Sequence, residues 1–416
     1  MRQQSYLVAN RLQISYFLTG YRFGRHGVLY QYNLLDVPER RALERIAKLR
    51  HDLRYMVQVE PRRWTGLLAR YTRARALRAS NSIEGINVSQ EDALAVIDGE
   101  DPADADRPTW RAVVGYRTAM DYLLQRCRDP RFEFTLDVVL AVHFMIAQDD
   151  LRANPGILRP GWVGVRNSVT GEVVHEGIDR DLLQPHLDLL LQYMSVANPA
   201  DTILKAAMTH LNLTLLHPFS DGNGRTARCL HTAVLAREGI IAPTFSSIEE
   251  YIGLHQQQYY DVLAEVGGGG WNPMRSAKPW VRFCIEAHYR QIQTLLRRTR
   301  RVERVWEELL LLAAANDLPE RTCFAMLEAS TGFKVRNSSY RVTADVSNNL
   351  ASRDLKALVD AELLVPEGEK RGREYSAGNA LRKIWLRYRL DAPTDDPFAE
   401  SEEDQPTLFP QETPTG

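Results

Sequence analysis

Apolar residues recur at three- and four-residue spacing through most of the first 315 residues, and this periodicity constrains the fold more than any other feature of the chain. Between positions 38 and 59, for example, Leu43, Ile46, Leu49 and Leu53 share one helical face. Comparable patterns cover further segments at 66–79, 89–98, 108–127, 135–148, 181–195, 201–216, 224–237, 249–264 and 277–315. The chain is therefore predicted to be mainly α-helical.

One strand signal interrupts this helical region, between residues 161 and 177. Two β-branched runs, at 162–165 and 172–174, flank Val169, Thr170 and Gly171. Such runs on either side of a glycine turn are typical of a β-hairpin.

The pattern changes after Ala315. Two short helices are expected at 319–327 and 347–360, followed by two strands at 363–365 and 373–376 around a polar turn. The order helix, helix and paired strands resembles a small winged helix-turn-helix domain.

The charge of the chain is divided unevenly. The whole chain has 52 basic and 53 acidic residues, but the last 26 residues, from Asp391, hold eight acids and no Lys or Arg. This acidic, proline-containing tail at 391–416 is predicted to be disordered, because it cannot bury enough apolar surface to fold alone. The remaining body is mildly basic, which suits an anionic substrate or partner.

The sequence also bears on location. Its longest aliphatic stretch, 309–315, is far shorter than the roughly 18 residues of a membrane span, and the first residues lack a signal-peptide core. Four widely spaced cysteines without a C-x-x-C pair argue against a disulfide framework or a zinc ribbon. A cytoplasmic protein with no membrane partner is expected, its cysteines buried as small hydrophobic residues.

The densest group of unusual residues is the segment 217–228, which reads HPFSDGNGRTAR between two helical patterns. Gly222 and Gly224 can expose backbone N–H groups at the positive end of the helix that follows, which favours phosphate. Arg225 and Arg228, three positions apart, can both reach phosphate oxygens from one helix face. Asp221 supplies a carboxylate suited to Mg²⁺ held between phosphates.

His217 is the remaining polar group of this segment. An isolated His before Pro is usually a helix-end residue, but eight specified neighbours favour a functional role here. A neutral imidazole beside a phosphate site can act as a general base for a hydroxyl that attacks phosphorus.

The segment 217–228 matches every specified position of H-P-F-x-D/E-G-N-G-R-x-x-R, and on it the chain resembles the Fic (Fido) domain family. The similarity runs from about Ser80 to about His288. It implies a helical Fic-type fold with a β-hairpin flap. It also implies a protein adenylyltransferase, which moves AMP from ATP to a Ser, Thr or Tyr hydroxyl of a target protein.

The resemblance assigns roles to particular residues. His217 would be the base and Asp221 the Mg²⁺ ligand, while Arg225 and Arg228 would bind the β- and γ-phosphates of the co-substrate ATP. The phosphate cradle would comprise Gly222, Asn223 and Gly224, and the hairpin would pin the target segment. Tyr259 and Tyr260 occupy the place of a Tyr pair that lines the nucleotide pocket, although Tyr on a helix is more often core packing.

Upstream, residues 80–85 fit S/T-x-x-x-E-G/N, the inhibitory motif of the family. This resemblance implies that Glu84 pairs with Arg228 in the γ-phosphate position, so that ATP binds misaligned for attack. In the simpler interpretation, Ser80 is a helix N-cap and Glu84 a first-turn acid that favours the helix dipole.

These expectations divide the chain into four parts: an N-terminal helical region at 1–79, a Fic domain at 80–300, a linker helix with the winged helix at 301–390, and the tail. A self-inhibited adenylyltransferase is the first function to consider. Within the family, other phosphate-containing donors, removal of AMP from targets and self-modification stay open, and so does a homodimer.

A second function is a DNA-binding regulator whose Fic domain senses nucleotides or is otherwise repurposed. Seven residues would then contact DNA, the first four at base edges and the rest at phosphates: Asn348, Asn349, Ser352, Arg353, Lys370, Arg371 and Arg373. A kinase or P-loop NTPase is not expected, since neither of their signature motifs is present.

Overall fold

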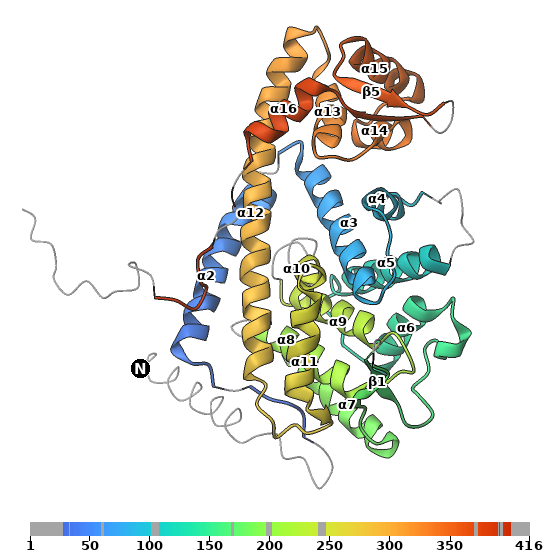
Figure 1. Ribbon diagram of the computed structural model, residues 1–416, viewed down its shortest axis with the longest axis vertical. Helices are drawn as coiled ribbons and strands as arrows, with labels where there is room; N and C mark the ends of the chain where they lie inside the picture. The colour runs from blue at the N-terminus through green and yellow to red at the C-terminus, as the bar shows by residue number, and fades with distance from the viewer. Residues whose placement is uncertain are drawn as a thin grey trace, which may run out of the picture.

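The computed structural model describes residues 28–32, 34–59, 62–100, 108–167, 170–196, 202–239, 247–369, 373–389, 391 and 394–400. Helices make up most of this structure, with two small sheets, as predicted (Figure 1).

The helices of the larger part follow the apolar periodicity closely. They are α2 (Val37–Arg54) with the π-helical turn η1 (Tyr55–Val59), α3 (Thr65–Ile83), α4 (Gln90–Asp98), α5 (Pro108–Arg126), α6 (Leu136–Ala147), η2 (Leu151–Ala153), α7 (Arg180–Ser195), α8 (Thr202–Leu216), α9 (Asn223–Arg237), α10 (Glu249–Leu254), α11 (Gln256–Gly267) and α12 (Lys278–Ala315). The predicted helix at 249–264 is two helices, because the backbone leaves the helical conformation at His255 (φ −122°, ψ 38°).

Helix α12 is the long central helix of the molecule. It spans 38 residues and lies alongside α2, α8, α10 and α11 before it reaches the C-terminal unit (Figure 1). The sequence predicts that the Fic domain ends at residue 300, but α12 continues through this position without a break. One continuous helix thus joins the two parts of the chain.

The first sheet contains the predicted hairpin. Strands β1 (Gly164–Arg166) and β2 (Val173–Glu176) pair antiparallel, and β3 (Gly269–Gly270) pairs in parallel with β2. Of the predicted turn, Val169 lies outside the described residues, and Gly171 has φ 73°. Strand β3 was not predicted, because two glycines have none of the β-branched or aromatic character that marks a strand.

The C-terminal unit follows α12. It consists of η5 (Glu320–Thr322), α13 (Cys323–Ser330), β4 (Val335–Arg336), α14 (Asn337–Thr343), α15 (Asn348–Asp360), β5 (Leu364–Glu367), β6 (Glu374–Ala377) and α16 (Asn379–Arg387). Its sheet has the order β4-β6-β5, with β6 antiparallel to both neighbours. The two expected helices and the paired strands are present, whereas β4, α14 and α16 were not predicted.

Helix α3 connects this unit to the rest of the fold. Near its start, the Tyr71 ring stacks on Phe333 of the C-terminal unit with centroids 4.3 Å apart. Arg70 lies 3.1 Å from Glu328 and also pairs with Asp98 of α4. Residues of α3 and of the C-terminal unit belong to one hydrophobic core, so the two parts pack as neighbours.

The beginning of the acidic tail differs from its expected disorder. Residues 394–400 lie on α2 and α12, where Asp395 accepts a hydrogen bond from Gln293 at 3.1 Å and Arg282 lies 4.0 Å from the Phe398 ring centroid. Arg45 donates to the carbonyl of Asp396 at 3.3 Å. The prediction of disorder rests on average composition, which does not reveal that individual acidic and aromatic residues of the tail contact arginines on two helices. The remainder, 401–416, lies outside the described residues.

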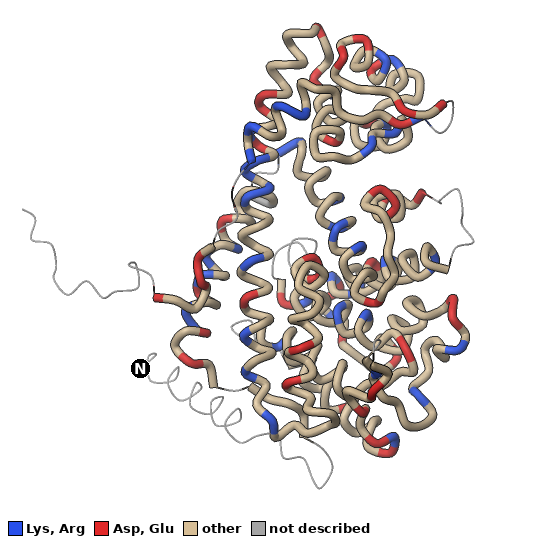
Figure 2. The backbone as a smooth tube through the Cα atoms, viewed as in Figure 1, with Lys and Arg blue, Asp and Glu red and all other residues tan. Residues whose placement is uncertain are grey.

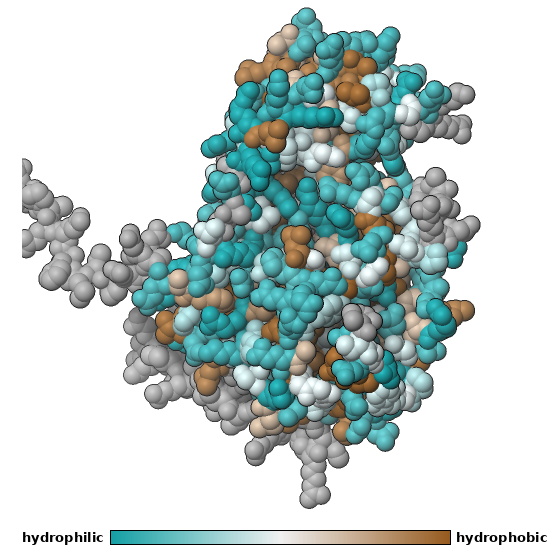
Figure 3. Space-filling model, in the orientation of Figure 1, coloured by the Kyte–Doolittle hydropathy of each residue, from teal (hydrophilic) through white to brown (hydrophobic). Residues whose placement is uncertain are grey.

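The four cysteines are buried and unpaired, as predicted. Basic and acidic residues are interspersed along α2 and α12 (Figure 2), and apolar residues form small separate patches on the face shown in Figure 3. Within the described ranges, no helix has the length and apolar character needed to cross a membrane.

Candidate active site

The segment 217–228 forms a tight loop between α8 and the start of α9. His217 and Gly222 both have left-handed backbone conformations, with φ of 52° and 76°. Between them, the fully buried Phe219 side chain anchors the loop in the core. Left-handed residues near both ends allow the chain to turn sharply between His217 and the first turn of α9, and Asp221 of this loop is close enough to act on the charge of His217.

His217 has the form of a general base. Its Nδ1 lies 3.2 Å from the Thr214 carbonyl, which can only accept, so Nδ1 carries the proton. The Nε2 lone pair is therefore available. Burial lowers the pKa of this imidazole to about 4, despite the opposing effect of the Thr214 hydrogen bond. The ring is thus neutral near pH 7, as proton transfer from a hydroxyl requires.

The start of α9 is an uncapped helix N-terminus. Gly222 occupies the N-cap position and provides no side-chain acceptor for the first N–H groups of the helix. These groups and the helix dipole form an anion site. Two buried arginine nitrogens there, Nε of Arg225 and one terminal nitrogen of Arg228, have no partner among the described residues. Phosphate oxygens could satisfy such donors.

A carboxylate already lies at this anion site. Glu84 Oε1 is 2.8 Å from the Arg228 guanidinium. A Cβ atom added to Gly224 would lie only 2.5 Å from the same oxygen, so the carboxylate lies directly against the first turn of α9. Burial opposes the charge of Arg228, but the nearby Glu84 outweighs it and raises the pKa of the guanidinium.

Ser80 completes the contacts of Arg228. Arg228 Nε donates to Ser80 Oγ at 2.7 Å, and a terminal nitrogen donates to the Ser80 carbonyl at 3.0 Å. Ser80 lies inside α3, and Glu84 is the residue after its last turn. The simpler interpretation of this segment, an N-cap with a first-turn acid, is therefore wrong: the apolar pattern of 66–79 continues to Ile83 as one helix.

Asn223 has a different role from the predicted phosphate cradle. Its side-chain oxygen accepts from the Phe219 N–H, and its nitrogen donates to the Phe219 carbonyl, both at 2.9 Å. The residue is 3% exposed. Its side-chain amide therefore fixes the shape of the loop, and the backbone N–H groups at the start of α9 are what the loop offers to an anion.

Asp221 is the one acid within the loop. Its side chain is 62% exposed and lies 3.3 Å from the Arg225 guanidinium. The described residues contain no group of three His, Cys, Asp or Glu side chains that could hold a metal ion. A single exposed carboxylate beside a phosphate site nevertheless fits Mg²⁺, which usually binds one or two carboxylates together with substrate phosphates.

The two tyrosines of α11 lie in different surroundings. Tyr259 is buried in the core, with its hydroxyl 3.0 Å from His210 Nε2. Tyr260 is 42% exposed, and its hydroxyl donates to the Ile83 carbonyl at 2.7 Å. Gln256 donates to the same carbonyl at 2.9 Å. Both donors from α11 thus hold the end of α3, next to Glu84.

Three residues of this site were not found from the sequence: Gln256, His143 and Arg159. His143 stacks on Phe219 with centroids 3.7 Å apart, and its Nε2 donates to the Asp221 carbonyl at 2.9 Å. Burial lowers the pKa of His143 to about 4, which keeps the ring neutral. On a helix with an apolar pattern, a single His carries no signal that distinguishes this contact from ordinary packing.

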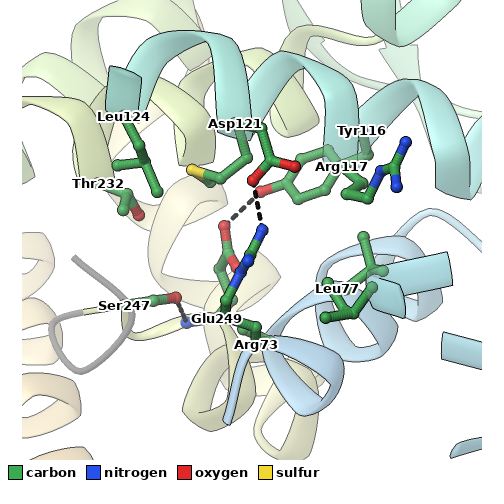
Figure 4. A pocket seen from close by; sticks show the side chains of 12 residues that line it. Arg73, Leu77, Tyr116, Arg117, Asp121, Leu124, Thr232, Ser247 and Glu249 are labelled. Atoms are coloured by element: carbon green, nitrogen blue, oxygen red, sulfur yellow. Dashed lines mark hydrogen bonds and ion pairs between the residues drawn. The ribbon is translucent and has the colours of Figure 1, made fainter. Parts of the chain in front are cut away.

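A separate pocket lies behind α3, lined also by α5 and by the segment before α10 (Figure 4). Within it, the Tyr116 hydroxyl donates to Glu249, and Arg73 pairs with Asp121. Burial raises the pKa of Glu249 to about 7. The ion pair links α3 to α5, and the hydrogen bond links α10 to α5. Helix α3 is therefore held on the side that lines this pocket as well as at its C-terminal end.

Comparison with known proteins agrees with this geometry. Residues 133–235 match the model of the Fic/DOC family. This chain contains a Fic domain. The Fic domain match includes β1, β2, the loop 217–228 and most of α9, and it begins after the Ser80–Gly85 segment.

Two curated relatives are named as adenylyltransferases. The chain is 32% identical over 149 residues to the protein adenylyltransferase fic-1 of Caenorhabditis briggsae, covering 34% of this chain and 28% of that protein. It is 26% identical over 187 residues to the protein adenylyltransferase Fic of Nematostella vectensis, covering 45% of this chain and 40% of that protein. The chain thus spans less than half the length of these relatives.

Solved structures confirm the Fic-type fold. A Fic family protein from Desulfovibrio desulfuricans aligns with a TM-score of 0.54 and 19% identity, over 85% of this chain and 99% of that one. A fragment of Fic-1 from C. elegans aligns with a TM-score of 0.50 and 20% identity, over 62% of this chain and 72% of that one.

Proposed function

We propose that this protein is an adenylyltransferase, which transfers AMP from ATP to a hydroxyl side chain of a target protein. The observation that carries the proposal is the pairing of a neutral imidazole, His217, with an anion site at the start of α9. The Fic domain and the names of the two curated relatives support the same reaction.

In the proposed reaction, His217 Nε2 takes the proton of the target hydroxyl as its oxygen attacks the α-phosphorus. The bond from that phosphorus to the bridging oxygen breaks, and pyrophosphate leaves. Arg225 and Arg228 hold the β- and γ-phosphates and stabilise the charge of the leaving group. Asp221 would hold Mg²⁺, which neutralises phosphate charge when bound.

The protein is further proposed to inhibit itself. Glu84 pairs with the Arg228 guanidinium, which would otherwise bind the γ-phosphate, and its carboxylate lies against Gly224. ATP can then bind only with its phosphates displaced, so that the α-phosphorus is not aligned for attack. Release requires the end of α3 to move away from Arg228.

The β1–β2 hairpin is proposed as the flap that holds the target. Trp162 is exposed before β1, and Val173 and Val174 are exposed on β2. An extended target segment could add to the edge strand β1 by backbone pairing. The hydroxyl to be modified would then face His217.

The C-terminal unit is proposed to be a winged helix that locates targets. Its helix α15 exposes Asn348, Asn349, Ser352 and Arg353, the residues expected at base edges if the unit binds DNA instead. Arg373 is exposed as well, whereas Lys370 and Arg371 lie outside the described residues. A gel shift of the full chain with duplex DNA would distinguish these two roles.

The transfer reaction can be tested with labelled ATP. We expect the Glu84→Gly variant, incubated with Mg²⁺ and host lysate, to label protein from α-labelled but not from γ-labelled ATP. Adding His217→Ala should lower labelling by about 10²–10⁴-fold, while ATP binding measured by calorimetry is retained. Equal labelling by both variants would refute the role of His217, and label from γ-labelled ATP would indicate phosphorylation instead.

A further inference from the structure

The backbone of His217 is held in a conformation that residues with a side chain rarely adopt. Its φ is 52°, in the left-handed region. Such conformations persist only where the surrounding structure holds them, and they gather at functional sites. The contacts around His217 therefore indicate what fixes its position.

Arg159 is the side chain that binds this backbone. Its Nε donates to the His217 carbonyl at 2.8 Å, and its own N–H donates to the Pro218 carbonyl at 3.0 Å. Its two terminal nitrogens donate to the carbonyls of Gly161 and Ile178. Gly161 precedes β1 and Ile178 follows β2, so one guanidinium joins His217 to both ends of the hairpin.

Arg159 is only 1% exposed. Within the described residues, the hydrogen bonds of its guanidinium all go to backbone carbonyls. Charge-assisted bonds of this kind are about twice as strong as neutral ones, and a buried cation is costly unless its donors are satisfied. Loss of Arg159 would leave three carbonyls without this donor, so the arrangement depends on this side chain.

Gly177 brings the hairpin into direct contact with the same group. A Cβ atom at this position would lie 3.1 Å from His217 Cβ, 3.2 Å from the Arg159 guanidinium and 2.9 Å from the side chain of Val163. Only a residue without a side chain fits here unless these groups move. The root of the hairpin, Arg159 and His217 therefore form one closely packed unit.

We propose that Arg159 is a positioning residue: it fixes the His217 imidazole relative to the β1–β2 hairpin, so that a hydroxyl held by the hairpin meets Nε2. This inference rests on the proposed adenylyltransferase function. Arg159 does not lie at the phosphate-binding end of the loop, which is formed by the start of α9. The structure thus predicts that transfer depends on Arg159 while ATP binding does not.

The test compares single variants in the Glu84→Gly background. Arg159→Lys keeps the positive charge but loses the planar guanidinium that reaches three carbonyls. Gly177→Ala places a methyl group against His217 without removing any charge. We expect each to lower the rate of labelling from α-labelled ATP by about tenfold or more, with the Kd for ATP changed less than about twofold. Arg152→Lys, at an exposed arginine of the same connecting segment, is the matched control and should label like its parent.

The outcomes separate the inference from the function on which it rests. If the Glu84→Gly parent labels no protein, the proposed function fails. If the parent labels and both variants, verified as folded by their thermal midpoints, label at the same rate, the role of Arg159 is overturned. A parallel loss of ATP binding would also overturn it, because the defect would then lie in the fold or the phosphate site. If Arg159→Lys does not fold, Gly177→Ala alone decides.

Discussion

The Glu84 carboxylate lies 2.8 Å from the Arg228 guanidinium, although 144 positions separate the two residues. Glu84 follows the last turn of α3, where the helix dipole disfavours an acid. Its position is therefore explained by its partner and not by its own helix. Because the same carboxylate lies against Gly224, it competes directly with any anion that binds at the start of α9.

Replacement of Glu84 by Gly should increase self-labelling from α-labelled ATP by about tenfold or more, because misalignment of reacting groups by about 1 Å can cost 10²-fold. A structural acid cannot give this result, since its loss changes the stability of the fold and not the alignment of ATP. Glu133→Gln, at an exposed acid, is the control and should label like wild type. Unchanged labelling by a folded Glu84→Gly variant at saturating ATP would exclude self-inhibition.

The double variant Glu84→Gly with Arg228→Ala should label weakly. Inhibition needs both residues, but alignment of ATP needs only Arg228, so removing both leaves the phosphates without their buried cation. Labelling is compared with that of Glu84→Gly alone under the same conditions. Equal activity in the two variants would show that Arg228 does not bind the nucleotide.

Asp221→Ala should lose the Mg²⁺ dependence of transfer, because Asp221 is the one acid within the loop 217–228. Turnover of the Glu84→Gly background is titrated with Mg²⁺ with and without this change, and we expect both lower activity and a flattened response. Asp137→Ala, an exposed acid of α6, serves as the control. A titration curve identical to that of the parent would remove Asp221 from the metal site.

The sequence predicts this site better than it predicts how the site is held together. Helix periods located α8 and α9, and the composition of the loop indicated the anion site and the base. The long-range partners could not be found in this way, because a single Arg159 or His143 in an ordinary apolar pattern has no distinctive spacing. Asn223 illustrates the same limit: an amide suits phosphate and backbone equally well, and only the fold shows that it binds Phe219.

Gln256→Ala should partly relieve the inhibition. Its side chain donates to the Ile83 carbonyl, directly before Glu84, and a hydrogen bond of this kind contributes about 1 kcal/mol. If this hydrogen bond stabilises the position of α3 in which Glu84 binds Arg228, its loss should raise self-labelling by up to about fivefold. Gln257→Ala is the neighbouring control, because Gln257 donates to Asp261 on the surface. Identical labelling by both variants would mean that Gln256 does not restrain α3.

A buried histidine cluster makes the fold sensitive to acid. His231 Nε2 lies 3.1 Å from His288 Nε2, and Arg50 lies 3.2 Å from His288 Nδ1. Burial, assisted by the charge of Arg50, lowers the pKa of His231 to about 3 and that of His288 well below its usual value. Burial therefore favours the neutral form of both rings in the folded protein.

The free energy of unfolding should consequently fall as the pH drops below about 6.5, where these histidines bind protons in the unfolded chain but not in the folded one. Between pH 7.5 and pH 5, each such group costs about 2 kcal/mol. His231→Gln should be less stable at pH 7.5, yet lose about 2 kcal/mol less than wild type over this interval, as measured by urea unfolding at both pH values. His51→Gln, at an exposed histidine of α2, should lose as much as wild type. If His231→Gln and wild type lose the same free energy, His231 already exchanges its proton freely in the folded state, and the acid sensitivity arises elsewhere.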